Sequence, residues 1–116
     1  MKTIQGRLIT KTVKDLCIEA NIELRDDILS ALRSARRKES NAKARRVLDI
    51  IIYNARLAKR KKVPICQDTG MVVVYLKIGQ GVRIKGDINK AAEKGMAQAY
   101  KDGYFRKSVV TDPLLR

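Results

Sequence analysis

The sequence predicts a predominantly helical α+β fold. Apolar residues recur at intervals of three and four through most of the first half of the chain, which is the spacing of an amphipathic helix. A β-branched run from Met71 to Ile78 is typical of a strand, and a further helix-like segment follows it. A length of 116 residues leaves room for one small domain, so we predict a single domain over residues 1–116.

Three helices are predicted before residue 62, over 12–23, 26–38 and about 41–61. The apolar positions that define them are Val13, Leu16, Cys17 and Ala20; Ile28, Leu29, Leu32 and Ala35; and Ala44, Val47, Leu48, Ile51 and Leu57, widened by Ile50 and Ile52. Aspartates begin the second helix and basic residues end it, which suits the helix dipole. Ser40 or Asn41 can cap the third helix.

The second half of the chain is predicted to contain the strands. Pro64 stops the third helix, and 71–78 is apolar on both faces, which predicts a central strand covered on both sides. Residues 82–84 form a possible short second strand.

The last predicted helix covers 88–101, capped by Asp87 and closed by Gly103. Gly95 inside it costs about 1 kcal/mol relative to Ala, which indicates tight packing at that point. The remaining segment, 104–116, is expected to be extended and broken by Pro113.

Composition restricts the possible chemistry. The chain has no histidine, which excludes Ser–His and Cys–His nucleophiles and histidine-ligated zinc within it. Two cysteines far apart in sequence do not form a disulfide framework and fit a reducing compartment. No apolar run approaches the roughly 20 residues of a membrane helix, and we expect a soluble, cytoplasmic protein without a membrane partner.

The net charge of +14 has three interpretations: binding to nucleic acid, a solvated surface rich in Lys and Arg, or pairing with an acidic partner. Basic runs at 33–38, 43–46 and 59–62 support a small basic nucleic-acid-binding protein. Few aromatic residues are present for base stacking, and no helix-turn-helix or RNA-recognition signature appears. Nucleic acid is therefore the more distant alternative.

The segment Pro-Ile-Cys-Gln-Asp-Thr-Gly at 64–70 gathers small and polar groups between a helix end and an apolar run, a common place for a site. One interpretation is a tight turn in which Cys66 is a small buried residue. A second is an aspartic protease, whose catalytic tripeptide matches Asp68-Thr69-Gly70. Those proteases are almost wholly β, which disagrees with the helical pattern here.

The third interpretation is a family resemblance. Cys66-Gln67-Asp68-Thr69-Gly70, followed by an apolar run, resembles the first cluster-binding motif of class I, iron–sulfur-dependent fumarate hydratases. The segment 104–114, which contains Arg106-Lys107-Ser108-Val109-Val110, resembles the family's Arg-x-Ser-Val-Val-x-Asp-Pro-Leu block in order and spacing. Tartrate dehydratase alpha subunits are close relatives of this family.

The resemblance implies a [4Fe–4S] hydro-lyase that interconverts (S)-malate and fumarate plus water, or a tartrate dehydratase. It implies that Cys66 is a cluster ligand, that Gln67 and Asp68 lie beside the substrate with Asp68 catalytic, and that Arg106 binds a carboxylate. The other two cluster cysteines are expected beyond this chain, since Cys17 lies on an apolar helical stripe.

We therefore expect an N-terminal fragment of an alpha subunit or of a longer single chain, inactive and without a cluster on its own. Its partners would be the dicarboxylate, the rest of the alpha subunit, and a beta subunit or C-terminal domain. Wide apolar helix faces would also favour a homodimer through the N-terminal half.

Overall fold

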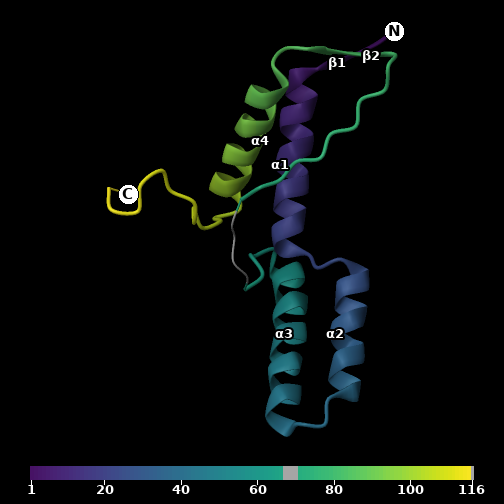
Figure 1. Cartoon of the computed structure of the whole chain (residues 1–116), viewed down its shortest axis with the longest axis vertical. Coiled ribbons are helices and arrows are strands. Elements are labelled where there is room, and N and C mark those ends of the chain that lie inside the picture. The colour runs from purple at the N-terminus through teal and green to yellow at the C-terminus, as the bar shows by residue number, and fades with distance from the viewer. Residues whose placement is uncertain (67–70, 116) are drawn as a thin grey trace. The chain divides into compact units, whose positions relative to one another are not determined.

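The structure is a computed structural model that describes residues 1–66 and 71–115. Along the chain, these residues form β1 (Lys2–Gln5), α1 (Gly6–Ile22), α2 (Asp26–Lys38), α3 (Ala42–Lys61), β2 (Val82–Lys85) and α4 (Ile88–Asp102) (Figure 1). The predominantly helical α+β fold is confirmed. None of the helices in the described part of the chain is long and apolar enough to cross a membrane.

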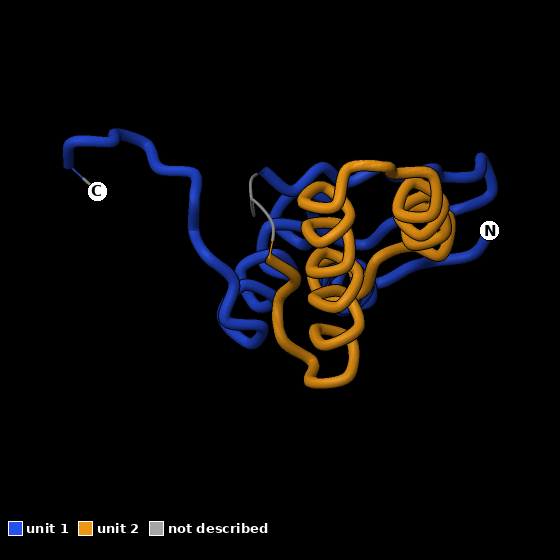
Figure 2. The backbone as a smooth tube through the Cα atoms, turned by 90° about the horizontal axis from the view of Figure 1, so that it is seen from below, with its two compact units in different colours: residues 1–19, 68–116 blue, residues 20–67 orange. Residues whose placement is uncertain are grey.

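The chain divides into two compact units, shown in different colours in Figure 2. Unit 1 contains Met1–Glu19 and Asp68–Arg116, and unit 2 contains Ala20–Gln67. The assignment of the whole chain to one domain stays a prediction.

Unit 1 holds a parallel two-stranded sheet. Lys2 pairs with Val82 and Gln5 with Lys85, and the Lys2 N–H donates to the Gly81 carbonyl at 2.9 Å. Ile4, Val82 and Ile84 are half-buried, while the residues between them are exposed, as the two-residue period of a strand requires. The short strand predicted at 82–84 is confirmed, whereas β1 was not predicted.

Small residues bring α1 and α4 together in unit 1. The buried residues of α4 are Ala91, Gly95 and Ala99, spaced four apart on one face. A Cβ built at Gly95 would collide with the Thr10 carbonyl oxygen and lie 3.0 Å from the Val13 Cβ. The Thr10 hydroxyl donates to the Ala91 carbonyl at 2.9 Å, which fixes the register of the two helices. The tight packing predicted at Gly95 is confirmed.

Unit 2 contains α2 and α3, joined by a short connection into a helical hairpin (Figure 1). The cap of α3 is Asn41 rather than Ser40, because the Asn41 Oδ1 accepts from Lys43 N at 2.9 Å and Ala44 N at 3.2 Å. The guanidinium of Arg36 donates to both carboxylate oxygens of Asp49, at 2.8 and 3.2 Å, and so links the two helices. The predicted bounds of α2 agree with the structure.

The first helix differs from its prediction at the start and on its buried face. It begins at Gly6 instead of residue 12, directly after β1, where a Cβ would lie 3.3 Å from the Lys85 carbonyl oxygen. Val13 and Cys17 are buried as expected, but Leu16 is 58% exposed. The packing of α4 against α1 covers only a narrow stripe, because its facing side chains are small.

The strand predicted over 71–78 is wrong for this structure. The segment has no regular secondary structure, and Met71 and Tyr75 are 81% and 93% exposed. A strand needs a neighbour to satisfy its backbone N–H and C=O groups. Among the described residues, the sheet consists of β1 and β2 alone, so 71–78 has no paired strand and is not covered.

Two further packing predictions are corrected. The apolar stripe of α2 contains no buried residue, and Val47 and Ile51 of α3 are 55% and 42% exposed. Of the predicted stripe of α3, Ile52 is buried, and the other buried residues are Ala55 and Ala58, which were not predicted. The apolar surface of α3 is broad, and a helix covers only the stripe that faces a neighbour. Gly103 is the C-cap of α4, but the left-handed residue is Tyr104, at φ 55°.

The α1–α4 contact gives a stability prediction. We expect Gly95→Ala to lower the free energy of unfolding by about 1–3 kcal/mol through overpacking, although Ala is the better helix former. Urea denaturation followed by circular dichroism would measure this. The matched control is Gly79→Ala, because nothing lies within 4 Å of a Cβ built at Gly79. Equal stability of the two variants would contradict the packing.

Candidate functional site

The turn that follows α3 carries the first candidate site residue. Lys62 ends the helix in the left-handed conformation, at φ 54°, and its N–H donates to the Ala58 carbonyl. The Val63 N–H also donates to the Ala58 carbonyl, at 3.2 Å. Pro64 then follows, and because it has no N–H and disfavours a helical conformation before it, the chain leaves the helix axis here.

Two hydrogen bonds fix the backbone as it reaches Cys66. Ile65 is buried, and its N–H donates to the Asn21 carbonyl at 2.9 Å. The Cys66 N–H donates to the side-chain oxygen of Asn54 at 2.9 Å. Cys66 itself is exposed and free. The turn therefore holds the backbone of this cysteine in place and leaves the residue accessible, which disagrees with the interpretation of Cys66 as a small buried residue.

Asn54 is a positioning residue that the sequence analysis missed. It lies on α3 among apolar neighbours and is half-buried. The sequence did contain a signal for this role, namely an amide side chain within the apolar run of a helix. A buried polar group without a hydrogen bond there lowers stability, so the amide needs a partner. The partner of that side chain is a residue of the next turn, which the helical spacing alone does not reveal.

An ion-pair cluster stabilises the same end of α3. The Glu23 carboxylate contacts the Nζ of Lys59 at 2.9 Å and that of Lys62 at 3.2 Å. The hydrogen bond from Lys59, followed by that from Lys62, lowers the pKa of Glu23 below its ordinary value. This cluster connects the segment after α1 to the last turn of α3, next to the turn that positions Cys66.

The second candidate segment begins after α4. Phe105 is buried, its ring meets that of Tyr100 edge to face at 5.6 Å, and its N–H donates to the Tyr100 carbonyl at 3.1 Å. A Cβ at Gly103 would collide with the Phe105 ring, so this close contact requires glycine. Arg106 follows directly and is exposed. Further along, Asp112 Oδ1 accepts from the backbone N–H groups of Leu114 and Leu115 in a turn.

The structure describes two of the four predicted site residues. Cys66 belongs to unit 2 and Arg106 to unit 1, and each is described within its own unit. Gln67 and Asp68, with Thr69 and Gly70, lie outside the described residues. Their predicted roles beside a substrate therefore stay predictions.

The described residues offer one accessible thiol for an iron–sulfur cluster. Cys17 is buried, and burial raises the pKa of its thiol, which disfavours the thiolate that binds iron. No group of three or more Cys, His, Asp or Glu side chains in the described part of the chain could hold a metal ion. The exposed Cys66 is compatible with cluster ligation as one donor of a larger set.

Comparison with known proteins identifies the family. Residues 10–116 match the family described as fumarate hydratase (fumerase). The match covers most of the chain, so the chain belongs to this family.

Two relatives agree with this assignment. A protein of Methanocaldococcus jannaschii, provisionally named L(+)-tartrate dehydratase subunit alpha, is 38% identical over 111 residues, which cover 93% of this chain and 38% of the relative. A protein of Geobacillus stearothermophilus, provisionally named fumarate hydratase class I, is 31% identical over 101 residues, covering 86% of this chain and 20% of the relative. The chain thus spans well under half the length of these relatives.

The Asn54 hydrogen bond gives a test of how Cys66 is positioned. We expect Asn54→Ala to lower the free energy of unfolding by about 1 kcal/mol, the usual value of one hydrogen bond. Hydrogen exchange at the Cys66 amide should accelerate, because its acceptor is gone. Asn89→Ala, at an exposed position of α4, is the control. Unchanged exchange at Cys66 in Asn54→Ala would contradict the assigned contact.

The Glu23 cluster predicts a dependence of stability on pH. Because the folded pKa of Glu23 is lowered, the cluster stabilises the fold above the ordinary glutamate pKa and loses this effect as the pH falls through the folded pKa. Wild type should be more stable than Glu23→Gln at pH 7, and the difference should shrink between about pH 5 and pH 3. Urea midpoints at several pH values measure it. Glu93→Gln, exposed on α4 and outside this cluster, is the matched control.

Proposed function

We propose that this chain is the N-terminal part of a [4Fe–4S]-dependent hydro-lyase that interconverts (S)-malate and fumarate plus water. The observation that carries the proposal is the family match over 10–116 together with an exposed, backbone-anchored Cys66. The 116 residues alone supply too few ligands for a cluster, so in this proposal they are inactive by themselves.

Cys66 is proposed as one thiolate ligand of the cluster, with the other two cysteines supplied by further sequence. The hydrogen bond to Asn54 and the buried Ile65 limit the positions that the thiol can reach. Such preorganisation lowers the entropy cost of assembling a metal site from several segments. When bound, the cluster would supply a Lewis acid for the departing hydroxyl group.

The protein side chains have the task of binding the dicarboxylate and moving a proton. Dehydration of malate breaks a C–O bond on one carbon and removes a proton from the next, and the electron pair left there forms the C=C bond. Gln67 and Asp68 are proposed to lie beside the substrate, with Asp68 catalytic. Arg106, held by the buried Phe105, is proposed to bind a carboxylate with two parallel N–H bonds.

Tartrate is the second candidate substrate. The specific observation in its favour is that the relative provisionally named tartrate dehydratase subunit alpha shares more identity with this chain than the one named fumarate hydratase. Under either proposal the partners are the rest of an alpha subunit and a beta subunit or C-terminal domain. The exposed apolar side chains of α3, among them Val47 and Ile50, support a homodimer as a further proposal.

The test uses the full-length protein with its beta partner, reconstituted with iron and sulfide without oxygen. We expect malate to produce fumarate, followed by ultraviolet absorbance, and Cys66→Ala to lose both turnover and the visible absorbance of the cluster. Turnover of tartrate but not malate would select the second substrate.

Cys17→Ala is the matched control for the thiol, because Cys17 is buried in unit 1. It should retain iron and activity while losing some stability. A full-length protein that binds no iron, or a Cys66→Ala variant that keeps its cluster, would contradict the proposed function.

A further inference from the structure

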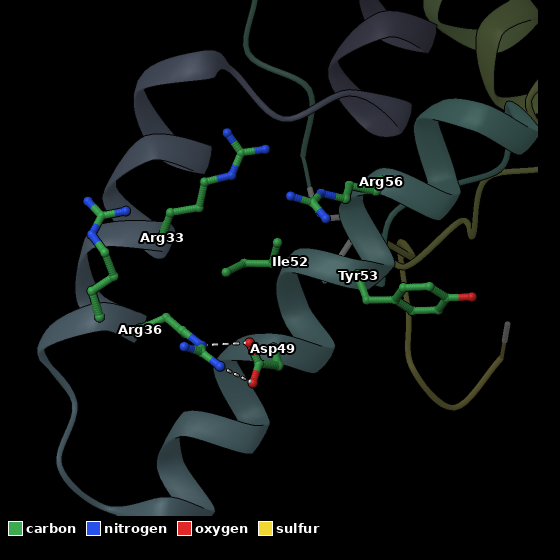
Figure 3. A pocket seen from close by; sticks show the side chains of 7 residues that line it. Arg33, Arg36, Asp49, Ile52, Tyr53 and Arg56 are labelled. Carbon is green, nitrogen blue, oxygen red and sulfur yellow. Dashed lines mark hydrogen bonds and ion pairs between the residues drawn. The ribbon is translucent and has the colours of Figure 1, made fainter.

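A basic groove lies between α2 and α3 in unit 2, with a volume of about 270 Å³ (Figure 3). On the α2 side it is lined by three arginines spaced i, i+3 and i+4. On the α3 side it is lined by four residues spaced i, i+3, i+4 and i+7, which lie on one side of that helix. The residues that line the groove are Arg33, Arg36, Arg37, Asp49, Ile52, Tyr53 and Arg56.

Within the described part of the chain, only Arg36 of the four arginines has its charge matched by a carboxylate. Arg36 is bound by Asp49 in a two-pronged contact, and this hydrogen bond lowers the pKa of Asp49 and raises that of Arg36. Arg33, Arg37 and Arg56 form no ion pair with any described residue. In Figure 3 the guanidinium groups of Arg33 and Arg56 extend from the two helices into the space between them, beside Ile52.

The helix dipole explains only part of this arrangement. Arg36 and Arg37 lie in the last turn of α2, where cations are favourable. Arg33 and Arg56 lie before the last turns of their helices, and they line a groove that Arg36 and Arg37 line as well. Cations gathered in this way repel one another unless an anion lies between them.

We propose that this groove binds a small multivalent oxyanion, either a phosphate group or a polycarboxylate. Guanidinium groups bind both through paired N–H donors, and arginines from two helices can hold one anion from opposite sides. The groove is slightly smaller than the usual range for drug-sized ligands, which favours a compact ligand. Its small volume disfavours a nucleic-acid duplex, which would contact a larger basic surface. Binding here would also join α2 to α3 and so stabilise the hairpin.

The experiment is calorimetric titration of the 116-residue chain with inorganic phosphate and, separately, with citrate, at a constant ionic strength set by sodium chloride. We expect saturable binding of at least one of them, and the stronger of the two identifies the source of the anion. Arg33→Gln and Arg56→Gln should each weaken binding about tenfold or more, the usual loss for one charged hydrogen bond. Arg46→Gln, exposed on α3 outside the groove, should not change it.

Asp49→Asn distinguishes a site from general charge screening. It removes the acid of the groove and releases Arg36, so the affinity for the anion should rise, although the Arg36–Asp49 link is lost. Circular dichroism of each variant verifies that the helices are retained.

The proposal would be overturned if neither anion showed saturable binding, or if Arg46→Gln weakened binding as much as Arg33→Gln does. Weaker binding in folded Asp49→Asn would also overturn it. So would tight, salt-sensitive binding of random duplex DNA that Arg33→Gln and Arg46→Gln weaken equally. None of these measurements depends on the hydro-lyase activity.

Discussion

Each exposed candidate residue that the structure describes follows directly after a buried apolar residue. The position of these candidate residues depends on that burial. Ile65 is buried and Cys66 is exposed, and Phe105 is buried and Arg106 is exposed. In each case the N–H of the buried residue is also hydrogen-bonded, to Asn21 or to Tyr100. Loops seldom have regular backbone hydrogen bonds to hold them, so a buried anchor gives an irregular segment a defined position. A functional side chain that follows the anchor can then be exposed and still be well placed.

The helices that carry these buried residues are held together by small residues and ion pairs. The chain has one Phe and no Trp, so few large side chains are available to fill space between helices. In unit 1, Ala91, Gly95 and Ala99 allow α4 to approach α1 closely. In unit 2, Arg36–Asp49 and the Glu23 cluster connect segments across the surface. Exposed pairs of this type are individually weak. The hairpin therefore depends on several modest contacts.

The net charge of +14 is reflected in the contacts of the acidic side chains. Asp15, Asp27, Asp49, Asp102 and Glu23 each contact a basic side chain in the described structure. With 26 basic and 12 acidic residues, most basic side chains cannot be matched in this way. Part of this excess lies where α2 and α3 face each other, since four arginines and one aspartate line the groove there, and an anion would supply charge that the chain lacks.

The helices of unit 2, the Asp87 cap, the close packing at Gly95 and the family of the chain could be predicted from the sequence, which left the α3 cap open between Ser40 and Asn41. Helical periodicity, capping side chains and short motifs are local, and a single sequence displays them directly. Three other features became visible in the folded chain: β1 pairs with β2, residues 71–78 form no strand, and the Cys66 N–H donates to the side chain of Asn54. Each of these depends on a hydrogen-bond partner distant in sequence. Composition and spacing indicate which polar groups need a hydrogen-bond partner. Which residue becomes that partner depends on the folded chain.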